Sequence, residues 1–231
     1  MPTLTIEKTG LRCFSGNALK LLAAVSMLID HIGMILLPQY GFLRILGRLA
    51  FPIFAFLIAE GCRYTRRPLR YLTNLFVLSL VCQAGSVIGD GRWTLCVPCS
   101  FFLGAAVLLC VRQAYLPGKA GRRWGYALLG AAAAAAAFGL AVSAGIDYGF
   151  IGVLLPLSAG LTYKRWPRLI LFGVGLAALS LAQGGIQFYG LLALPFLALY
   201  NGERGKLPLK WFFYIFYPVH LALLWGLRFC L

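Results

Sequence analysis

Long apolar stretches separated by short polar turns run along almost the whole chain. A helix that crosses a bilayer needs about 20 mostly apolar residues, with a range of roughly 17–25. Most of the stretches have about this length, although the sixth, seventh and eighth are shorter. We therefore predict an all-α fold, a polytopic bundle of about nine transmembrane helices. The predicted segments are Leu19–Leu37, Leu43–Ala59, Leu69–Ile88, Val97–Leu116, Trp124–Ala144, Gly149–Tyr163, Leu169–Ala182, Ile186–Tyr200 and Leu209–Phe229.

The composition indicates that lipid, not water, surrounds these segments. Hydrophobic residues make up 61% of the 231 residues and charged residues 12%, whereas a soluble domain is about 45–50% apolar and about 25% charged. No polar stretch between the segments is long enough to fold alone, so residues 1–231 are predicted to form a single integral membrane domain. The stretch Met1–Asn17 is polar and mixed, which differs from the pattern of a cleavable signal peptide.

The charge is strongly basic, with a formal net value of +15 at pH 7. A basic chain is a candidate for nucleic-acid binding, but the placement of the cations argues against that partner. If the N-terminus is cytoplasmic, nearly all of the 21 Lys and Arg residues fall at the cytoplasmic side. Arg44, Arg92 and Arg228 fall on the outer side, and Arg48 lies within the second segment. The positive-inside rule predicts this bias, so we expect a cytoplasmic N-terminus and an odd number of spans.

Ionisable residues inside the hydrocarbon are costly and usually mark function. His31 lies 11 residues beyond Lys20, which marks the inner edge of the first segment, and is therefore roughly 16 Å deep. His220 lies 10 residues beyond Lys210 at the inner edge of the last segment, at roughly 15 Å. The core is about 30 Å thick. The two histidines of the chain are thus predicted to share one level near the midplane, together with Asp30.

A second charged group belongs to this layer. Arg48 is 15 residues from Arg63 and therefore lies roughly 22 Å from the inner side. It can hold an anion or pair with Asp30. Adjacent helical residues point about 100° apart, so Asp30 and His31 are expected to meet different partner helices. The alternative is structural: each histidine bridges two helices and Asp30 and Arg48 form an ion pair. Histidine suits proton transfer near neutral pH, and we favour a functional site.

Three further groups have a structural and a functional interpretation. The inner arginines Arg63, Arg66, Arg67 and Arg70 follow from the positive-inside bias alone, or they bind phosphate. The aromatic run at residues 211–217 is typical of an interfacial belt, although Tyr217 lies three residues before His220 and can share its face. Cys96 and Cys99 are either a redox pair or two apolar thiols at a helix entry, which we favour. No second pair completes a metal site.

Stretches from the first segment to the last match the motifs of a known family. They are Met27-Leu-Ile-Asp-His-Ile-Gly33, Arg44-Ile-Leu-Gly-Arg-Leu-Ala-Phe-Pro-Ile-Phe-Ala-Phe-Leu-Ile-Ala-Glu-Gly61, Tyr64-Thr-Arg66 with Tyr71-Leu72, Asp147-Tyr-Gly149, Gly152-Val-Leu-Leu155, Tyr200-Asn-Gly-Glu-Arg-Gly205 and Phe212-Phe-Tyr-Ile-Phe-Tyr-Pro-Val-His-Leu221. Through these stretches the chain resembles the TraX family, named after the F-pilin acetylation protein of conjugative plasmids. In the third segment the family often has a carboxylate followed by Pro-Phe, where this chain has Cys82-Gln83-Ala84. The arginine expected after Tyr71-Leu72 is replaced by Thr73-Asn74.

The resemblance implies a membrane acyltransferase of the bacterial inner membrane. It would take acetyl-CoA from the cytoplasm and acetylate an amine or hydroxyl acceptor, such as a peptide N-terminus. No metal is implied, and the sequence is compatible with an oligomer. The family motifs fall on Asp30, His31, Arg44, Arg48, Glu60, Asp147, Tyr148 and His220.

Roles for these residues follow as expectations. His31 is the expected general base, oriented by Asp30 or His220, and Arg48 is expected to stabilise the oxyanion. An acetyl-histidine intermediate is the alternative route. The residues expected to hold CoA are Arg63, Arg66, Arg67, Arg70, Glu60 and Arg44, and those expected to hold the acceptor are Asp147, Tyr148 and Tyr217.

Two other functions are weighed against the enzyme. A small transporter or channel is favoured by intramembrane charges and by the prolines Pro52, Pro156, Pro195 and Pro218, but the chain has no internal repeat. A membrane scaffold would require the polar groups to satisfy one another only.

Overall fold

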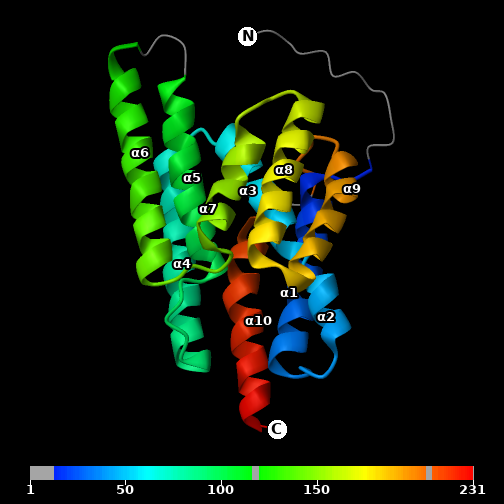
Figure 1. The fold of residues 1–231 in the computed structure, drawn as a ribbon. Helices are drawn as coiled ribbons and strands as arrows, with labels where there is room; N and C mark the ends of the chain where they lie inside the picture. The colour runs from blue at the N-terminus through cyan, green and yellow to red at the C-terminus, as the bar shows by residue number, and fades with distance from the viewer. Residues whose placement is uncertain (1–12, 116–119, 207–209, 231) are drawn as a thin grey trace.

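The computed structural model describes residues 13–115, 120–206 and 210–230. The stretch Met1–Asn17, predicted to lack a signal peptide, lies mostly outside the described residues. The described chain is helical, and the two bridges Phe14–Tyr200 and Leu95–Ile146 are isolated. The elements, shown in Figure 1, are α1 (Gly16–Ile35), α2 (Gly41–Gly47), α3 (Ala50–Tyr64), α4 (Pro68–Asp90), α5 (Val97–Ala114), α6 (Ala120–Ser143), α7 (Gly149–Gly160), α8 (Arg165–Gln183), the 3-10 helix η1 (Gly185–Leu192), α9 (Ala193–Ala198) and α10 (Lys210–Cys230).

The nine predicted segments all appear as helices in the described part of the chain. Among the described residues, six spans are long and apolar enough to cross a membrane, and α2 and α3 together form one of them, Gly41–Tyr64. Three shorter apolar spans follow: α7, then η1 with α9, and α10. The predicted seventh segment starts too late, because α8 begins at Arg165 and not at Leu169. Its first turn carries Arg168, whose buried ion pair with Glu60 allows a charged residue inside the helix.

The second span is broken where a continuous helix was predicted. Helix α2 ends at Gly47, and α3 begins at Ala50. Pro52 is the physical reason, since it lacks an N–H and its ring clashes with the carbonyl four residues earlier. That carbonyl belongs to Arg48, so the break falls at the intramembrane arginine. Arg48 is therefore presented at a helix joint and not on a regular helical face.

Helix α3 lies at the centre of the bundle. It packs against α1, α5, α7, η1 and α9, and its residues Phe51, Ile53, Ala55 and Phe56 are buried. A helix that is apolar all around belongs in the interior of a bundle. The peripheral helices α4 and α6 instead expose large apolar side chains, among them Leu128. These outward faces fit contact with lipid, and Figure 1 shows α6 at one edge of the molecule.

Helix α10 forms one side wall and packs against α1 and α4. In Figure 1 it extends furthest toward the end of the molecule opposite the start of α6. Its residue His220 is buried. This packing is what brings the last segment of the chain beside the first.

The orientation predicts which native thiol reacts from which side. Cys13 and Cys230 are both exposed, and they lie at the start of α1 and the end of α10. With a cytoplasmic N-terminus and an odd number of spans, a membrane-impermeant maleimide added to spheroplasts should label Cys230 and leave Cys13 unlabelled until the membrane is permeabilised. The two single-serine replacements identify the labelled site. Labelling of Cys13 in intact spheroplasts would contradict the topology.

Candidate active site in the membrane

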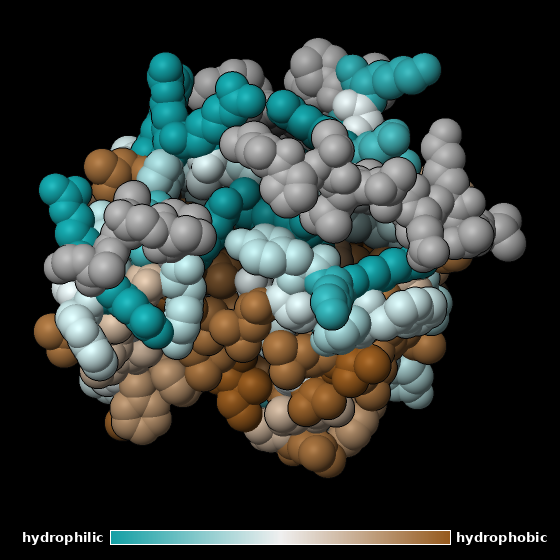
Figure 2. Space-filling view, turned by 90° about the horizontal axis from the view of Figure 1, so that it is seen from above, coloured by the Kyte–Doolittle hydropathy of each residue, from teal (hydrophilic) through white to brown (hydrophobic). Residues whose placement is uncertain are grey.

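A cavity of about 560 Å³ runs lengthwise between α1, α3, α4, α5 and α10. Helix α1 lines it from Gly16 to His31, a stretch roughly 22 Å long at about 1.5 Å per residue. Phenylalanine, leucine and tyrosine side chains line its middle. One end, called the inner end because the N-terminus is predicted to be cytoplasmic, lies at the start of α1. Figure 2 shows hydrophilic side chains gathered on the face of the molecule at this end. The other end is formed by Asp30, His31 and Tyr148.

The two histidines meet across α1 and α10. The Nδ1 atom of His31 lies 2.7 Å from Nε2 of His220, and Nδ1 of His220 lies 2.7 Å from the carbonyl oxygen of Phe216. The predicted common depth of the histidines is thus confirmed. Only His31 of the pair is part of the cavity lining, and Tyr217 packs edge-on against its ring.

The contacts define the tautomers of the pair. The Phe216 carbonyl can only accept, so neutral His220 carries its proton on Nδ1 and accepts at Nε2. His31 must then donate from Nδ1. Its Nε2 atom is left with a lone pair, as a general base requires.

Asp30 faces away from the histidines, as predicted from the 100° step between neighbours. It accepts from Nη1 of Arg44 at 3.1 Å and from Nη2 of Arg48 at 2.6 Å. The Nε atom of Arg48 also donates to the Arg44 carbonyl at 3.2 Å. Gly47 permits this approach, since a Cβ at that position would lie 2.2 Å from Asp30. Of the predicted orienting partners, His220 contacts His31, while Asp30 orients the arginines.

Tyr148 is held in an unusual backbone conformation beside this group. Its φ of +66° is the only positive value of a non-glycine residue in the described chain, and such strain clusters at functional sites. Nη1 of Arg48 donates to its hydroxyl at 3.3 Å. The ring stacks on Phe51 with centroids 3.8 Å apart. Arg48 itself is not among the lining residues, so its guanidinium reaches the cavity through Asp30 and Tyr148.

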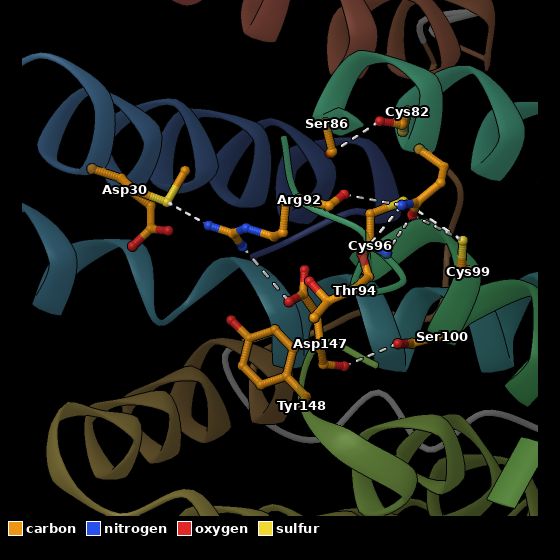
Figure 3. Close-up of polar contacts among 12 residues, drawn as sticks. Asp30, Cys82, Ser86, Arg92, Thr94, Cys96, Cys99, Ser100, Asp147 and Tyr148 are labelled. Atoms are coloured by element: carbon orange, nitrogen blue, oxygen red, sulfur yellow. Dashed lines mark hydrogen bonds and ion pairs between the residues drawn. The ribbon is translucent and has the colours of Figure 1, made fainter. Parts of the chain in front are cut away.

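On the outer side, Arg92 extends between two elements of the site (Figure 3). It lies 3.9 Å from an Asp147 carboxylate oxygen and donates to the sulfur of Met34 at 3.9 Å. Asp147 is fixed by its N–H to Leu95 and by Ser100, which donates to its carbonyl. Burial raises the pKa of the Asp147 carboxyl, while the charge of Arg92 lowers it. Sequence reasoning placed Arg92 in an outer loop and missed this contact, for which the sequence carries no signal.

At the inner end, Glu60 is enclosed in a polar cluster. It pairs with Arg168, accepts from the Tyr200 hydroxyl at 3.1 Å, and lies 3.9 Å from Arg63. Arg168 also donates to the Ala159 carbonyl at 2.7 Å. Glu60 lines the cavity, but its oxygens already have protein partners. Its predicted role in holding CoA remains a prediction, and its visible role is to join α3, α8 and the segment after α9.

This cluster predicts a stability effect. Glu60→Ala leaves the buried guanidinium of Arg168 without its carboxylate, and we expect a loss of about 3–5 kcal/mol. Glu60→Gln should lose less, because the amide oxygen still accepts. The apparent Tm in detergent, with Glu203→Gln as an exposed control, measures the difference. An unchanged Tm for Glu60→Ala would contradict the assigned role.

The arginines predicted to hold CoA do not line the cavity. Arg66, Arg67 and Arg70 are exposed, and Arg63 lies over the ring of Tyr163 at 4.9 Å. Neither these residues nor Arg44 are part of the cavity lining. Their roles therefore remain predictions. The cations that do line the inner end are Lys20 and Arg204, for which the sequence predicted no role in binding.

The cysteine pair sits at the start of α5. The sulfur atoms of Cys96 and Cys99 are 3.6 Å apart, and the two residues are free thiols. Gln83 accepts from the backbone N–H of Cys96 at 2.9 Å. Among the described residues, no cluster of His, Cys, Asp and Glu could hold a metal ion.

Known proteins resemble this chain over the residues that form the cavity. The model of the TraX protein family matches residues 15–228. A probable fimbrial assembly protein, FimC of serogroup H1, from Dichelobacter nodosus is 29% identical over 243 residues, covering 91% of this chain and 94% of that protein. The uncharacterized protein RP591 of Rickettsia prowazekii (strain Madrid E) is 53% identical over 72 residues, covering 31% of this chain and 27% of that protein. No solved structure matches significantly.

The family match covers the helices that build the cavity and both of its ends. It includes α1 with Asp30 and His31, the Arg48 joint, the Tyr148 turn, and α10 with His220. The chain is therefore a multi-pass membrane protein that belongs to the TraX family.

Proposed function

We propose that the protein is an acyltransferase of the bacterial inner membrane that moves an acetyl group from cytoplasmic acetyl-CoA to the N-terminal amine of a peptide. The observation that carries the proposal is a histidine with a free lone pair at Nε2, at the end of a cavity that begins on the side predicted to be cytoplasmic. Family membership supports this function. The relative described as a probable fimbrial assembly protein supports a pilin-like peptide as the acceptor.

His31 is the proposed general base. Its Nε2 atom takes the proton of the acceptor amine as the nitrogen attacks the thioester carbonyl carbon. His220 accepts from His31 Nδ1 and stabilises the imidazolium that forms. The C–S bond then breaks, and the leaving thiolate takes the proton from His31. The products are the acetylated amine and free CoA, so atoms and charges balance.

The sequence predicted that Arg48 stabilises the oxyanion directly. We propose instead that the hydroxyl of Tyr148 donates the hydrogen bond to the oxyanion. Because Nη1 of Arg48 donates to the Tyr148 oxygen, the hydroxyl proton is free to point into the cavity. A preorganised donor aimed at the developing charge lowers the barrier. Arg48 fixes the orientation of that hydroxyl, and Asp30 holds Arg48 in position.

A two-step route uses the same residues. His31 Nε2 attacks the thioester, CoA leaves, and the acetyl-imidazole is then attacked by the amine. This route would let an acetyl group reach an acceptor on the outer side without CoA crossing. Acetylation of His31 in protein incubated with acetyl-CoA alone, measured by mass spectrometry, separates the two routes.

The test of the function uses purified protein in nanodiscs with acetyl-CoA and pilin-type peptides. A peptide with a free N-terminus should gain the mass of one acetyl group, and free thiol should be released. A peptide with a formylated N-terminus should give neither result. A protein that forms no acetylated peptide, yet drives solute uptake into vesicles without acetyl-CoA, would overturn the proposal in favour of the transporter.

A further inference from the structure

Residues 199–206, which follow α9, contact the start of α1 and have no role in the proposed chemistry. Their backbone is attached to the first turn of α1: the N–H of Gly16 donates to the Glu203 carbonyl at 2.7 Å, and the N–H of Asn17 donates to the Arg204 carbonyl at 2.9 Å. Gly205 has a φ of +91°, and a Cβ there would lie 2.8 Å from Oγ of Ser15. The segment therefore holds Arg204 against the inner end of α1.

Lys20 and Arg204 together supply the positive charge at this end of the cavity. Lys20 lies one turn beyond Gly16 on α1, and both cations are part of the lining. Lys20 is half-buried and Arg204 is exposed. The acid in the same lining, Glu60, is neutralised by its pair with Arg168. The inner mouth is thus net positive and continuous with an apolar channel.

We propose that this mouth binds the phosphates of the acyl donor through Lys20 and Arg204. The inference rests on the proposed function, and it adds where and by which residues the donor is bound. Lysine and arginine are the side chains suited to phosphate, since their charged N–H groups make strong hydrogen bonds with its oxygens. The channel beyond would hold the uncharged arm that carries the thioester.

The dimensions support this placement. The arm of CoA between its pyrophosphate and its sulfur has about twelve covalent bonds, as many as four extended residues, and so reaches about 14 Å. Lys20 and His31 are separated by a helical rise of roughly 16 Å. A donor with its phosphates at Lys20 therefore brings its thioester close to His31. The apolar middle of the cavity accommodates an uncharged chain.

This phosphate site differs from the one predicted from the sequence, which consisted of the cluster Arg63, Arg66, Arg67 and Arg70. Arg66 and Arg67 lie in the α3–α4 turn, are exposed, and do not line the cavity. The neighbouring Tyr64 and Thr65 line the cavity, so phosphates bound at this turn would lie beside the mouth and not on cations of its lining. The structure thus favours a pair of cations that line the channel over a denser cluster beside it.

The test compares two probes, acetyl-CoA and S-acetyl-pantetheine, which lacks every phosphate. Binding of each is measured by calorimetry on detergent-purified wild type and on Lys20→Met/Arg204→Gln. The double variant should bind acetyl-CoA about 100-fold more weakly, at about tenfold for each charge-assisted contact. Its affinity for S-acetyl-pantetheine should stay unchanged, which also shows that the variant is folded. Lys20→Arg/Arg204→Lys should retain acetyl-CoA binding, and Arg122→Ala/Arg123→Ala is the matched control for loss of inner charge.

The outcomes separate the two proposals. Wild type that binds acetyl-CoA while the double variant binds it equally well overturns this inference and leaves the proposed function standing. A loss of acetyl-CoA binding in Arg66→Ala/Arg67→Ala, with the Lys20/Arg204 variant unaffected, overturns it in favour of the α3–α4 turn. Wild type that binds neither probe overturns the proposed function itself, and with it the assignment of a donor to the mouth.

Discussion

Replacing His31 with alanine is expected to lower kcat for acetyl transfer by about 10²–10⁴-fold, which is the contribution of a well-placed acid–base group. The dissociation constant of acetyl-CoA should change little, because the imidazole contacts only the reacting end of the donor. Initial rates at saturating donor and peptide measure the effect. The His31 side chain is only partly buried, and its hydrogen-bond partner is the single side chain of His220 on α10. The variant should therefore remain folded.

His220 provides the matched comparison, because it contacts His31 and is not part of the cavity lining. His220→Gln keeps an acceptor for the Nδ1 proton of His31 and should retain much more activity than His220→Ala. A difference between these two variants in kcat, with KM unchanged, indicates that His220 positions the base. Full activity of His31→Ala would contradict the base assignment, and equal activity of the two His220 variants would contradict the positioning role.

Tyr148→Phe is expected to reduce kcat by about 10²–10³-fold, the effect of losing one oxyanion donor. The phenyl ring keeps the stacking on Phe51, so the fold of the turn is retained. Arg48 loses one hydrogen bond but keeps its pair with Asp30. The effect should therefore appear in kcat and leave acetyl-CoA affinity unchanged.

Tyr163→Phe is the control for this change, since Tyr163 is an exposed residue near the inner end whose ring lies beneath Arg63. Its kinetics should equal those of wild type. If Tyr148→Phe is as active as this control, the hydroxyl donates no catalytic hydrogen bond. The oxyanion would then need a different donor.

Helix positions and depths could be predicted because they depend on local pattern. Apolar blocks of about 20 residues indicate the spans, and about 1.5 Å of rise per residue places His31 and His220 at one level. The contact between them confirms that level. The 100° step between neighbours likewise separates Asp30 from His31, and the structure gives each its own partner helix.

The lateral arrangement of the helices could not be predicted in the same way. Glu60 pairs with Arg168 across 108 positions of sequence, and neither helical pattern reveals its neighbour. The cations at the mouth of the cavity could not be identified from charge alone. The positive-inside bias explains every inner cation equally well and gives no reason to single out Lys20 or Arg204. Which cations line a cavity depends on packing, and that information comes only from the fold.

The most direct test of the account uses proteoliposomes of uniform orientation, with acetyl-CoA supplied to one side and a free-amine pilin-type peptide in excess. Acetylated peptide is measured by mass spectrometry for wild type and His31→Ala. We expect product only when the donor is on the side of the N-terminus, and almost none with His31→Ala. Product formed equally from either side, or unchanged by loss of His31, would contradict a channel that leads from the inner mouth to this histidine.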